Sequence, residues 1–354
     1  MRVGILTFHR AKNFGAVLQC YALYQYLHNV GYDVCVIDYR PDYLAGVKDE
    51  ISFFGRLKTI LKSALYWIVN CGETEYGDVF REFIKANLPL AGLEDIGSLD
   101  AIVCGSDQIW NSQICRGYDP IFFGMVPKLQ KIPVICYAAS MGKVDSIPEK
   151  EEFLRKLKNY RAISVREQSL SQKLTSCGIY NTIVVDPVIL AGCQVFKNVL
   201  ISIRQKGPYV LVYELTRLQG TYDFARRIAS QINAEIVVIG GGAKQCLNLR
   251  IHNKQWLSPS QFVSYFSDAS CVVTNSFHGL AFSLVYNKPF YCLKTSTWKD
   301  DRNISLLSQL GLEGRMVDCG TKLFFDSIDY SKISPKIDEM KEMSYRYLVG
   351  NLKK

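Results

Sequence analysis

The chain opens with a strand, a helix and a second strand. Residues 2–8 and 34–37 are apolar runs, and residues 16–28 repeat apolar side chains at helical spacing. A turn with Asn13 and Gly15 joins the first run to the helical segment. A strand, a crossover helix and a following strand form a βαβ unit, the building block of parallel sheets. This opening therefore predicts an α/β fold.

The same alternation continues in two series. The first predicts further strands at 101–104, 133–138, 162–165 and 182–185. The second predicts strands at 209–213, 235–239, 271–274 and 290–293, with helices at 221–232, 259–267 and 280–286. A chain of 354 residues exceeds one ordinary core. We expect two Rossmann-like, doubly wound domains joined near 191–208, with boundaries at 1–195 and 196–330, and a C-terminal helix within 331–354 that starts at about Pro335.

Composition excludes several classes of protein. Hydrophobic residues make up 48% of the chain, which is typical of a globular protein. The net charge of +9 suits an acidic small substrate, an anionic glycan or an anionic membrane surface as well as DNA, and no nucleic-acid-binding motif is present. The 12 cysteines lie in apolar runs without metal-ligand spacing, so we expect reduced thiols and no metal site. With no signal-peptide pattern, the chain is predicted to be cytoplasmic.

One segment stands apart from the two series. Within residues 51–70, apolar side chains such as Leu57 and Leu61 share a helical face, and Arg56, Lys58 and Lys62 surround it. This is the pattern of an amphipathic, basic helix. The segment either packs on its own domain or makes a peripheral contact with the inner face of the membrane.

The strand predicted at 271–274 stops at a polar turn that holds Ser276, His278 and Gly279. Ligands bind at strand ends in open α/β sheets, and the N-terminus of the following helix offers free N–H groups to an anion. His278 is therefore a candidate active-site residue beside bound negative charge. A buried or capping histidine is the alternative.

Other turns have the same placement between a strand and a helical pattern. The first holds His9, Asn13 and Gly15, and is either a ligand-binding turn or an ordinary surface turn. The next is rich in hydrogen-bonding and stacking groups that suit a sugar, although its Ser and Asp are also common helix caps: Asp107, Gln108, Trp110 and Asn111.

Basic and glycine-rich turns offer further anion sites. Arg166 follows a predicted strand and can bind phosphate or carboxylate, or pair with Glu167. Gly240, Gly241 and Gly242 with Lys244 form a weak anion-binding pattern without Walker A spacing. No G-x-G-x-x-G sequence follows the first strand, so a nicotinamide or flavin cofactor is not expected.

Six short segments, in order along nearly the whole chain, resemble the polysaccharide pyruvyl transferase family. They are residues 13–19, 105–111, 137–142, 164–167, 186–187 and 276–279. The resemblance implies two Rossmann-like domains facing a cleft, in a glycosyltransferase-B-like arrangement. It also implies transfer of a pyruvyl group from phosphoenolpyruvate to sugar hydroxyls of a bacterial cell-surface glycan or its lipid-linked precursor, without a cofactor.

The resemblance assigns His278 as the catalytic histidine, with Asp107 and Arg166 beside it in the donor or acceptor site. Many family members carry an arginine where this chain has Ser276, so donor anchoring must differ. The candidate donor-binding residues are Ser276, Gly279, Arg302, Lys288, Lys294, Gly241 and Gly242. The candidate acceptor-binding residues are His9, Asn13, Gly15, Gln108, Trp110 and Asn111.

Two other functions stay open at this point. A nucleotide-sugar-dependent glycosyltransferase would have the same fold, and Asp107 and Trp110 fit it. A non-catalytic glycan-binding relative is the other, because Ser276 departs from the family pattern. Whether His278 acts as an acid or as a base is also open.

Overall fold

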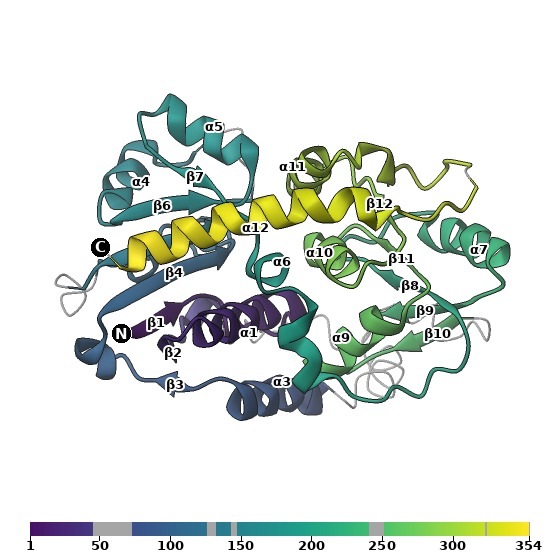
Figure 1. The fold of residues 1–354 in the computed structure, drawn as a ribbon, viewed down its shortest axis with the longest axis horizontal. Coiled ribbons are helices and arrows are strands. Elements are labelled where there is room, and N and C mark those ends of the chain that lie inside the picture. Colours follow the sequence, from purple (N-terminus) through teal and green to yellow (C-terminus); the bar gives the residue numbers. More distant parts are fainter. Residues whose placement is uncertain (45–72, 126–131, 143–146, 241–250, 323, 354) are drawn as a thin grey trace, which may run out of the picture.

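The structure, a computed structural model, contains two parallel β-sheets with helices packed around them (Figure 1). It describes residues 1–44, 73–125, 132–142, 147–240, 251–322 and 324–353. The predicted amphipathic helix at 51–70 and the predicted donor-site residues Gly241 and Gly242 lie outside the described residues.

The N-terminal sheet has seven strands in the order β3-β2-β1-β4-β5-β6-β7, and every pair is parallel. The strands are β1 (Arg2–Leu6), β2 (Asp33–Ile37), β3 (Leu90–Ala91), β4 (Ala101–Asp107), β5 (Val134–Ala139), β6 (Ala162–Val165) and β7 (Thr182–Ile183). The central strands are buried along nearly their whole length, as in sheets that helices cover on both faces.

The C-terminal sheet has six strands in the order β10-β9-β8-β11-β12-β13, again all parallel. The strands are β8 (Tyr209–Tyr213), β9 (Glu235–Ile239), β10 (Ile251–Lys254), β11 (Cys271–Thr274), β12 (Phe290–Leu293) and β13 (Met316–Val317). Strand order reverses between β1 and β4 in the first sheet and between β8 and β11 in the second. At such switch points the carboxyl ends of neighbouring strands leave a crevice for a ligand.

The helices follow the strands in doubly wound fashion. The described α-helices are α1 (Phe14–Asn29), α3 (Glu73–Asn87), α4 (Lys150–Leu157), α5 (Gln168–Ser176), α6 (Pro187–Ala191), α7 (Thr221–Gln231), α9 (Pro259–Asp268), α10 (Phe277–Val285), α11 (Asp301–Leu310) and α12 (Tyr330–Leu352). Within these described segments, no helix is long and apolar enough to cross a membrane.

Helix α12 leaves the C-terminal sheet and returns to the N-terminal one (Figure 1). The hydroxyl of Ser344 accepts a hydrogen bond from the amide of Val185 at 2.9 Å. The Tyr347 hydroxyl donates to the carbonyl of Cys136, on β5, at 2.7 Å. The C-terminal helix therefore fastens the two halves of the chain together.

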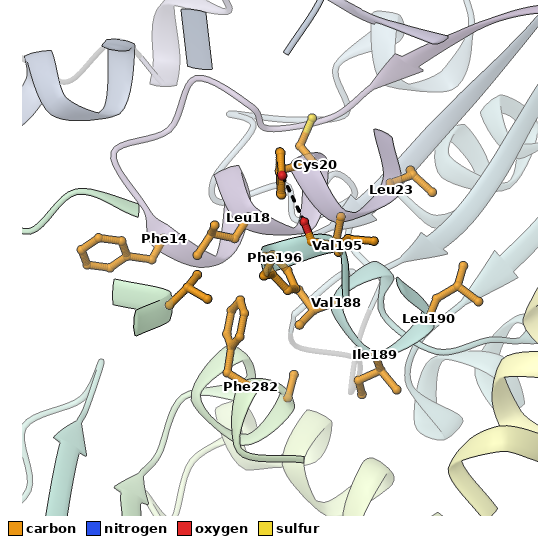
Figure 2. Packing of buried hydrophobic residues seen from close by; sticks show 14 of the residues in the cluster. Phe14, Leu18, Cys20, Leu23, Val188, Ile189, Leu190, Val195, Phe196 and Phe282 are labelled. Carbon is orange, nitrogen blue, oxygen red and sulfur yellow. Dashed lines mark hydrogen bonds between the residues drawn. The ribbon is translucent and has the colours of Figure 1, made fainter. Parts of the chain in front are cut away.

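A shared hydrophobic cluster also joins the halves (Figure 2). The ring of Phe14 on α1 stacks on Phe262 of α9, with centroids 4.3 Å apart. Phe196 lies 5.3 Å from Phe282 of α10. The contact between Phe14 and Phe262 fixes the first turn of α1 against the C-terminal half. Both halves supply polar groups to the candidate functional site, so their relative position matters.

The predicted α/β fold with two Rossmann-like halves is confirmed. Helix α10 begins at Phe277 rather than at residue 280, and α12 begins at Tyr330 rather than near Pro335. The sheets change between Ile183 and Tyr209, a span that includes the predicted junction. The ten cysteines in the described part of the chain are all free thiols.

Candidate functional site

His278 occupies the first turn of α10, directly after the carboxyl end of β11. The helix is capped by Ser276, whose hydroxyl accepts from the amide of Gly279 at 3.4 Å. The Thr274 hydroxyl accepts from the amide of Ser276 at 3.0 Å. A β-carbon at Gly279 would overlap Thr274, so glycine permits this tight turn. Ser276 and Gly279 thus hold His278 in place, and contact with a donor stays a prediction for both.

Gly15, in the first turn of α1, brings the N-terminal half against His278. A β-carbon at Gly15 would overlap the imidazole ring of His278. Asn13 caps α1 by accepting a hydrogen bond from the amide of Ala16 at 3.1 Å. The structure therefore joins two predicted site residues, Gly15 and His278, through direct packing between α1 and α10.

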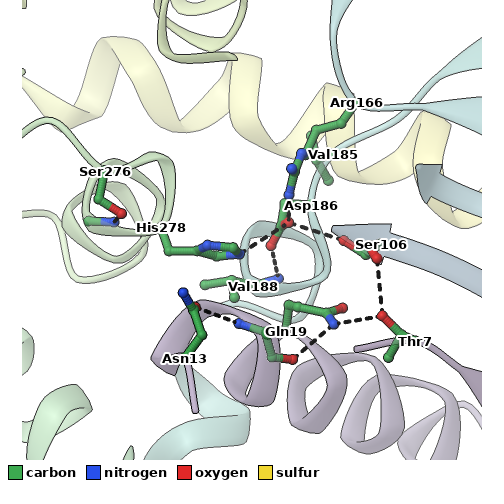
Figure 3. A network of polar contacts seen from close by, with 12 residues as sticks. Thr7, Asn13, Gln19, Ser106, Arg166, Val185, Asp186, Val188, Ser276 and His278 are labelled. Carbon is green, nitrogen blue, oxygen red and sulfur yellow. Dashed lines mark hydrogen bonds and ion pairs between the residues drawn. The ribbon is translucent and has the colours of Figure 1, made fainter. Parts of the chain in front are cut away.

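Asp186 is the centre of the polar network shown in Figure 3. Its fully buried carboxylate accepts from Nη1 of Arg166 at 2.6 Å and from the Ser106 hydroxyl at 3.2 Å. The other carboxylate oxygen caps α6 by accepting from the amide of Val188 at 2.9 Å. Nε2 of His278 lies 3.7 Å from Oδ2 of Asp186, the oxygen that binds Arg166. An Asp before a proline is also an ordinary helix cap, so the sequence context alone does not identify Asp186 as a site residue.

Two arginines present unused donors here. Arg166 stacks on the ring of Phe277 at 4.2 Å, and its Nε donates to Glu167 at 3.3 Å. Its buried Nη2 has no hydrogen-bond partner within the described residues, and the same holds for Nε of Arg302 on α11. Buried guanidinium donors are almost always satisfied, so an anionic ligand is the natural partner for both.

The surroundings of His278 favour the neutral form of its imidazole. Burial lowers the pKa of its imidazole below the ordinary value, and the positive charges of Arg166 and Arg302 lower it further. The carboxylates of Asp186 and Asp107 act in the opposite direction without reversing the shift. Because 3.7 Å exceeds hydrogen-bonding distance, Nε2 of His278 has no partner among the described residues. A neutral imidazole with a free nitrogen can accept or relay a proton.

Asp107 completes the group from the end of β4. Its backbone has φ of 68°, and Gly105 before it has φ of 129°. A side chain at Gly105 would strike the carbonyl of Tyr137, so this bend depends on glycine. The charge of Asp107 acts on His278, Arg166 and Arg302. All three residues predicted as catalytic are therefore neighbours.

The structure corrects the prediction for Trp110. Its side chain is fully buried, with Nε1 donating to the Tyr160 hydroxyl at 3.2 Å and its ring packed against Phe123 and Phe153. No face of the indole is open to a sugar. The bend at the end of β4 directs this residue into the core instead.

Gln108 and Asn111 bind each other beside Trp110. Nδ2 of Asn111 donates to the side-chain oxygen of Gln108 at 2.7 Å. The side-chain oxygen of Asn111 accepts from the amide of Gln113 at 3.0 Å. Asn111 is buried, whereas Gln108 is partly exposed, so acceptor binding stays a prediction mainly for Gln108.

The structure also disagrees with the predictions for His9 and Lys288. His9 is fully buried, and its Nε2 lies 3.0 Å from Asp38, so no acceptor sugar can reach it. Lys288 precedes β12 and therefore lies at the amino edge of the C-terminal sheet. His278 follows the carboxyl end of β11, at the opposite edge, because the two strands are parallel. The predictions of sugar binding by His9 and donor binding by Lys288 are thus not supported.

Metal-binding geometry is a separate question. Across the residues that the structure describes, no group of three or more His, Cys, Asp or Glu side chains is arranged to hold a metal ion.

Lys294, a predicted donor-binding residue, forms a surface ion pair with Asp318 at 3.4 Å, so its charge already has a partner.

Solved structures that are similar to this chain include sugar epimerases and a heptosyltransferase. The UDP-GlcNAc 2-epimerase of Methanocaldococcus jannaschii, solved with UDP-GlcNAc and UDP, has a TM-score of 0.50 and 13% identity over 96% of this chain and 93% of its own. The Neisseria meningitidis enzyme of that name has a TM-score of 0.50 and 12% identity, over 97% and 94%. The Escherichia coli heptosyltransferase WaaC has a TM-score of 0.40 and 15% identity, over 84% and 90%. At these identities the likeness to the two epimerases shows the fold alone.

The family of the chain is identified by its sequence. No curated protein matches the chain. The profile of the polysaccharide pyruvyl transferases matches residues 13–297, a span that includes Gly15, Asp107, Arg166, Asp186 and His278. The chain therefore belongs to the polysaccharide pyruvyl transferase family, which is a family of enzymes.

Proposed function

We propose that the protein transfers the pyruvyl group of phosphoenolpyruvate to two hydroxyls of one sugar, in a cell-surface polysaccharide or its lipid-linked precursor. The observation that carries this proposal is the buried imidazole of His278, whose Nε2 has no hydrogen-bond partner among the described residues, beside two guanidinium groups that have unused donors within the same ranges. These groups lie where the carboxyl ends of two parallel sheets face each other. Family membership supports the same reaction class.

The reaction needs both proton transfer and charge stabilisation. Two sugar hydroxyls add to C2 of phosphoenolpyruvate, and the bond from C2 to the phosphate oxygen breaks. One hydroxyl proton ends on C3, which becomes a methyl group, and the other leaves with inorganic phosphate. No oxidant or reductant is consumed, so acid–base groups and an anion site are sufficient.

His278 can serve as the proton carrier. Its neutral imidazole accepts the proton of an attacking hydroxyl, and the resulting imidazolium is stabilised by the nearby carboxylates of Asp186 and Asp107. The imidazolium can then protonate C3 of the donor. A proton-transfer group of this kind contributes roughly 10²- to 10⁴-fold to a rate.

Arg166 and Arg302 are the proposed phosphate ligands. Their unpartnered N–H groups would bind the donor phosphate and neutralise it as it departs. Asp186 and Phe277 fix the plane of the Arg166 guanidinium, so this donor is oriented before the substrate arrives. Such an anchor does not need an arginine at the position of Ser276.

We place the activity in the cytoplasm, and at the inner face of the membrane if the acceptor is lipid-linked. The glycan acceptor follows from the family, and the chain's net charge of +9 favours an acidic partner.

The test is an assay of the full chain with phosphoenolpyruvate and candidate glycans. Phosphate release should match, mole for mole, the gain of pyruvyl mass on the glycan. His278→Ala should abolish both, whereas Lys332→Gln, at an exposed lysine on α12, should leave both unchanged. Glycan binding without turnover would instead identify a non-catalytic relative.

A nucleotide-sugar-dependent glycosyltransferase is the second candidate. It is favoured by a cavity of about 400 Å³ beside the site and by the UDP-GlcNAc bound to the epimerase of similar fold. A ligand that binds the native state raises the melting temperature. Stabilisation by nucleoside diphosphates and not by phosphoenolpyruvate would favour this candidate.

A further inference from the structure

The cavity beside the proposed active site lies at the carboxyl ends of β8, β9 and β10. Its volume is about 400 Å³, within the range of small-molecule sites. It is bordered on the other side by the start of α1, so both halves of the chain line it. The lining residues that matter here are Lys12, Arg217, Lys254, Glu214, Asn13 and Trp256.

The cavity carries an excess of positive charge. Its three basic side chains, Lys12, Arg217 and Lys254, make no ion pair with any other residue of the described ranges. The carboxylate of Glu214, the acidic group among these lining residues, accepts hydrogen bonds from the hydroxyls of Thr221 at 2.9 Å and Tyr222 at 3.1 Å. Three unpaired cations around one cavity are suited to a multiply charged anion.

The charge balance at His278 is different. There Arg166 and Arg302 face three carboxylates, Asp107, Asp186 and Glu167. Once the donor phosphate has bound these two arginines, the three carboxylates leave no cation there, among the described residues, for a second large anion. The cavity is therefore the better place for any phosphate that the substrates carry besides the donor's own.

The cavity adjoins the proposed active site through two short connections. Asn13 lines the cavity, and Gly15, two residues later, touches His278. The side-chain oxygen of Asn275, three residues before His278, accepts from the amide of Leu215 at 2.9 Å, and Leu215 also lines the cavity. The cavity and the proposed active site are thus linked through two short stretches of chain.

The cavity also offers a ring surface and more room than one phosphate needs. Trp256 lines it and has a backbone φ of 57°, which is rare for an aromatic residue. Backbone strain of this kind is concentrated at ligand sites, where the surrounding structure maintains it. A partly exposed indole is a common platform for a sugar or a base.

We propose that this cavity binds a sugar diphosphate, with Lys12, Arg217 and Lys254 on the diphosphate and Trp256 against a ring. Two sources share this chemistry, a lipid-linked saccharide and a nucleotide sugar. The inference rests on the proposed function in one respect: under pyruvyl transfer, the diphosphate anchors the acceptor while its sugar reaches His278.

The first test is calorimetric titration of the full chain with inorganic pyrophosphate, without any donor. Arg217→Gln and Lys254→Gln should each weaken binding by about tenfold or more, because charged hydrogen bonds are lost. Lys332→Gln is the matched control and should bind like the wild type. Equal binding by all four proteins overturns the proposal. Thermal melts should show that the two variants stay folded, since neither side chain has an ion pair with another described residue to lose.

The second test identifies the source of the diphosphate. UDP-glucose and a short-chain polyprenyl diphosphate sugar in detergent are titrated in parallel, with and without Trp256→Ala. Tighter binding than pyrophosphate by either ligand, lost in Trp256→Ala, supports the proposal and names the source. Failure of both to exceed pyrophosphate overturns the role of the ring.

The outcomes separate this inference from the proposed function. His278→Ala should keep pyrophosphate affinity while losing turnover. Pyrophosphate binding by an enzyme without pyruvyl transfer would defeat the proposed function alone. Turnover that is insensitive to Arg217→Gln and Lys254→Gln would defeat the cavity proposal alone. Displacement of pyrophosphate by phosphoenolpyruvate would overturn the acceptor assignment, since it would make the cavity the donor site.

Discussion

Two polar clusters in this protein, one partly exposed and one buried, combine histidine, arginine and aspartate for different purposes. The Asp38 cluster consists of His9, Arg10, Asp38 and Arg40. The Asp186 cluster consists of Ser106, Arg166, Asp186 and His278. The histidine lies 3.0 Å from the carboxylate in the first and 3.7 Å in the second. That difference separates a closed structural contact from one that a substrate can complete.

In the Asp38 cluster, His9, Arg10 and Arg40 all bind the carboxylate of Asp38. Burial by itself would raise the pKa of the Asp38 carboxyl, but hydrogen bonds from His9, Arg10 and Arg40 outweigh it and hold the pKa well below the usual range. Arg10 binds both carboxylate oxygens at 2.7 Å. These groups have their partners, so the cluster's function is to tie β2 to the turn after β1.

In the Asp186 cluster some hydrogen-bonding capacity is unused. Nη2 of Arg166 and Nε2 of His278 have no partner in the part of the chain that the structure describes, and the neighbouring Nε of Arg302 also has none. Unpaired buried polar groups cost stability, and a ligand that pairs with them recovers that cost. These unused hydrogen-bonding groups are the reason that we propose the second cluster as the binding site.

The largest expected difference between the clusters is in stability. Arg166→Gln leaves Asp186 and Glu167 buried without their cation, and should lower the free energy of unfolding by about 3–5 kcal/mol. Arg10→Gln should cost about 1 kcal/mol, because the Arg10 side chain is 20% exposed and Asp38 keeps its other partners. Urea unfolding of both variants measures the difference. Equal losses would remove the distinction between the clusters.

The packing of Gly15 against His278 gives the next effect. Gly15→Ala places a methyl group in the imidazole ring, and should cost about 1–3 kcal/mol of stability while displacing His278. Gly97→Ala is the matched control, since its added β-carbon meets nothing within 4 Å and should change stability by less than about 0.5 kcal/mol. Thermal unfolding and turnover of both variants are compared. A harmless Gly15→Ala would mean that His278 is not held against α1.

The smallest effect is a pH dependence of stability. Since burial lowers the pKa of His278 below 6.5, the unfolded chain binds a proton there before the folded chain does. Stability from this residue is therefore complete above pH 6.5 and falls as the pH drops below it, by at most about 1.4 kcal/mol per pH unit. Urea unfolding at pH 7.5 and pH 5.5 should show a steeper loss in the wild type than in His278→Gln. Parallel losses would indicate an ordinary His278 pKa.

The fold was predictable because central parallel strands are long apolar runs. Strands β3 and β13 have only two residues each, too few for any periodicity to show, and β10 carries polar side chains (Ile251–Lys254). These edge strands form because a neighbouring strand offers free hydrogen-bonding groups. Sequence patterns carry little of that information.

The candidate site was predictable only in part. His9 and His278 both follow a strand in a polar turn, and what distinguishes them is the tertiary partner. His9 meets Asp38, 29 residues away in the chain, at hydrogen-bonding distance. The sequence around Asp186 is that of a helix cap and indicates no further role. Its central position depends on Ser106 from β4 and on Arg166, which follows β6.

The most direct test compares the two histidines. Steady-state kcat/KM for pyruvyl transfer is measured for His278→Gln and His9→Gln, with each value corrected for the folded fraction. His278→Gln should lose at least about 100-fold, the range for removal of a proton-transfer group. His9→Gln should stay within about threefold of the wild type, because its contacts are structural. Comparable losses in the two variants, or full activity in His278→Gln, would contradict the assignment of the Asp186 cluster as the active site.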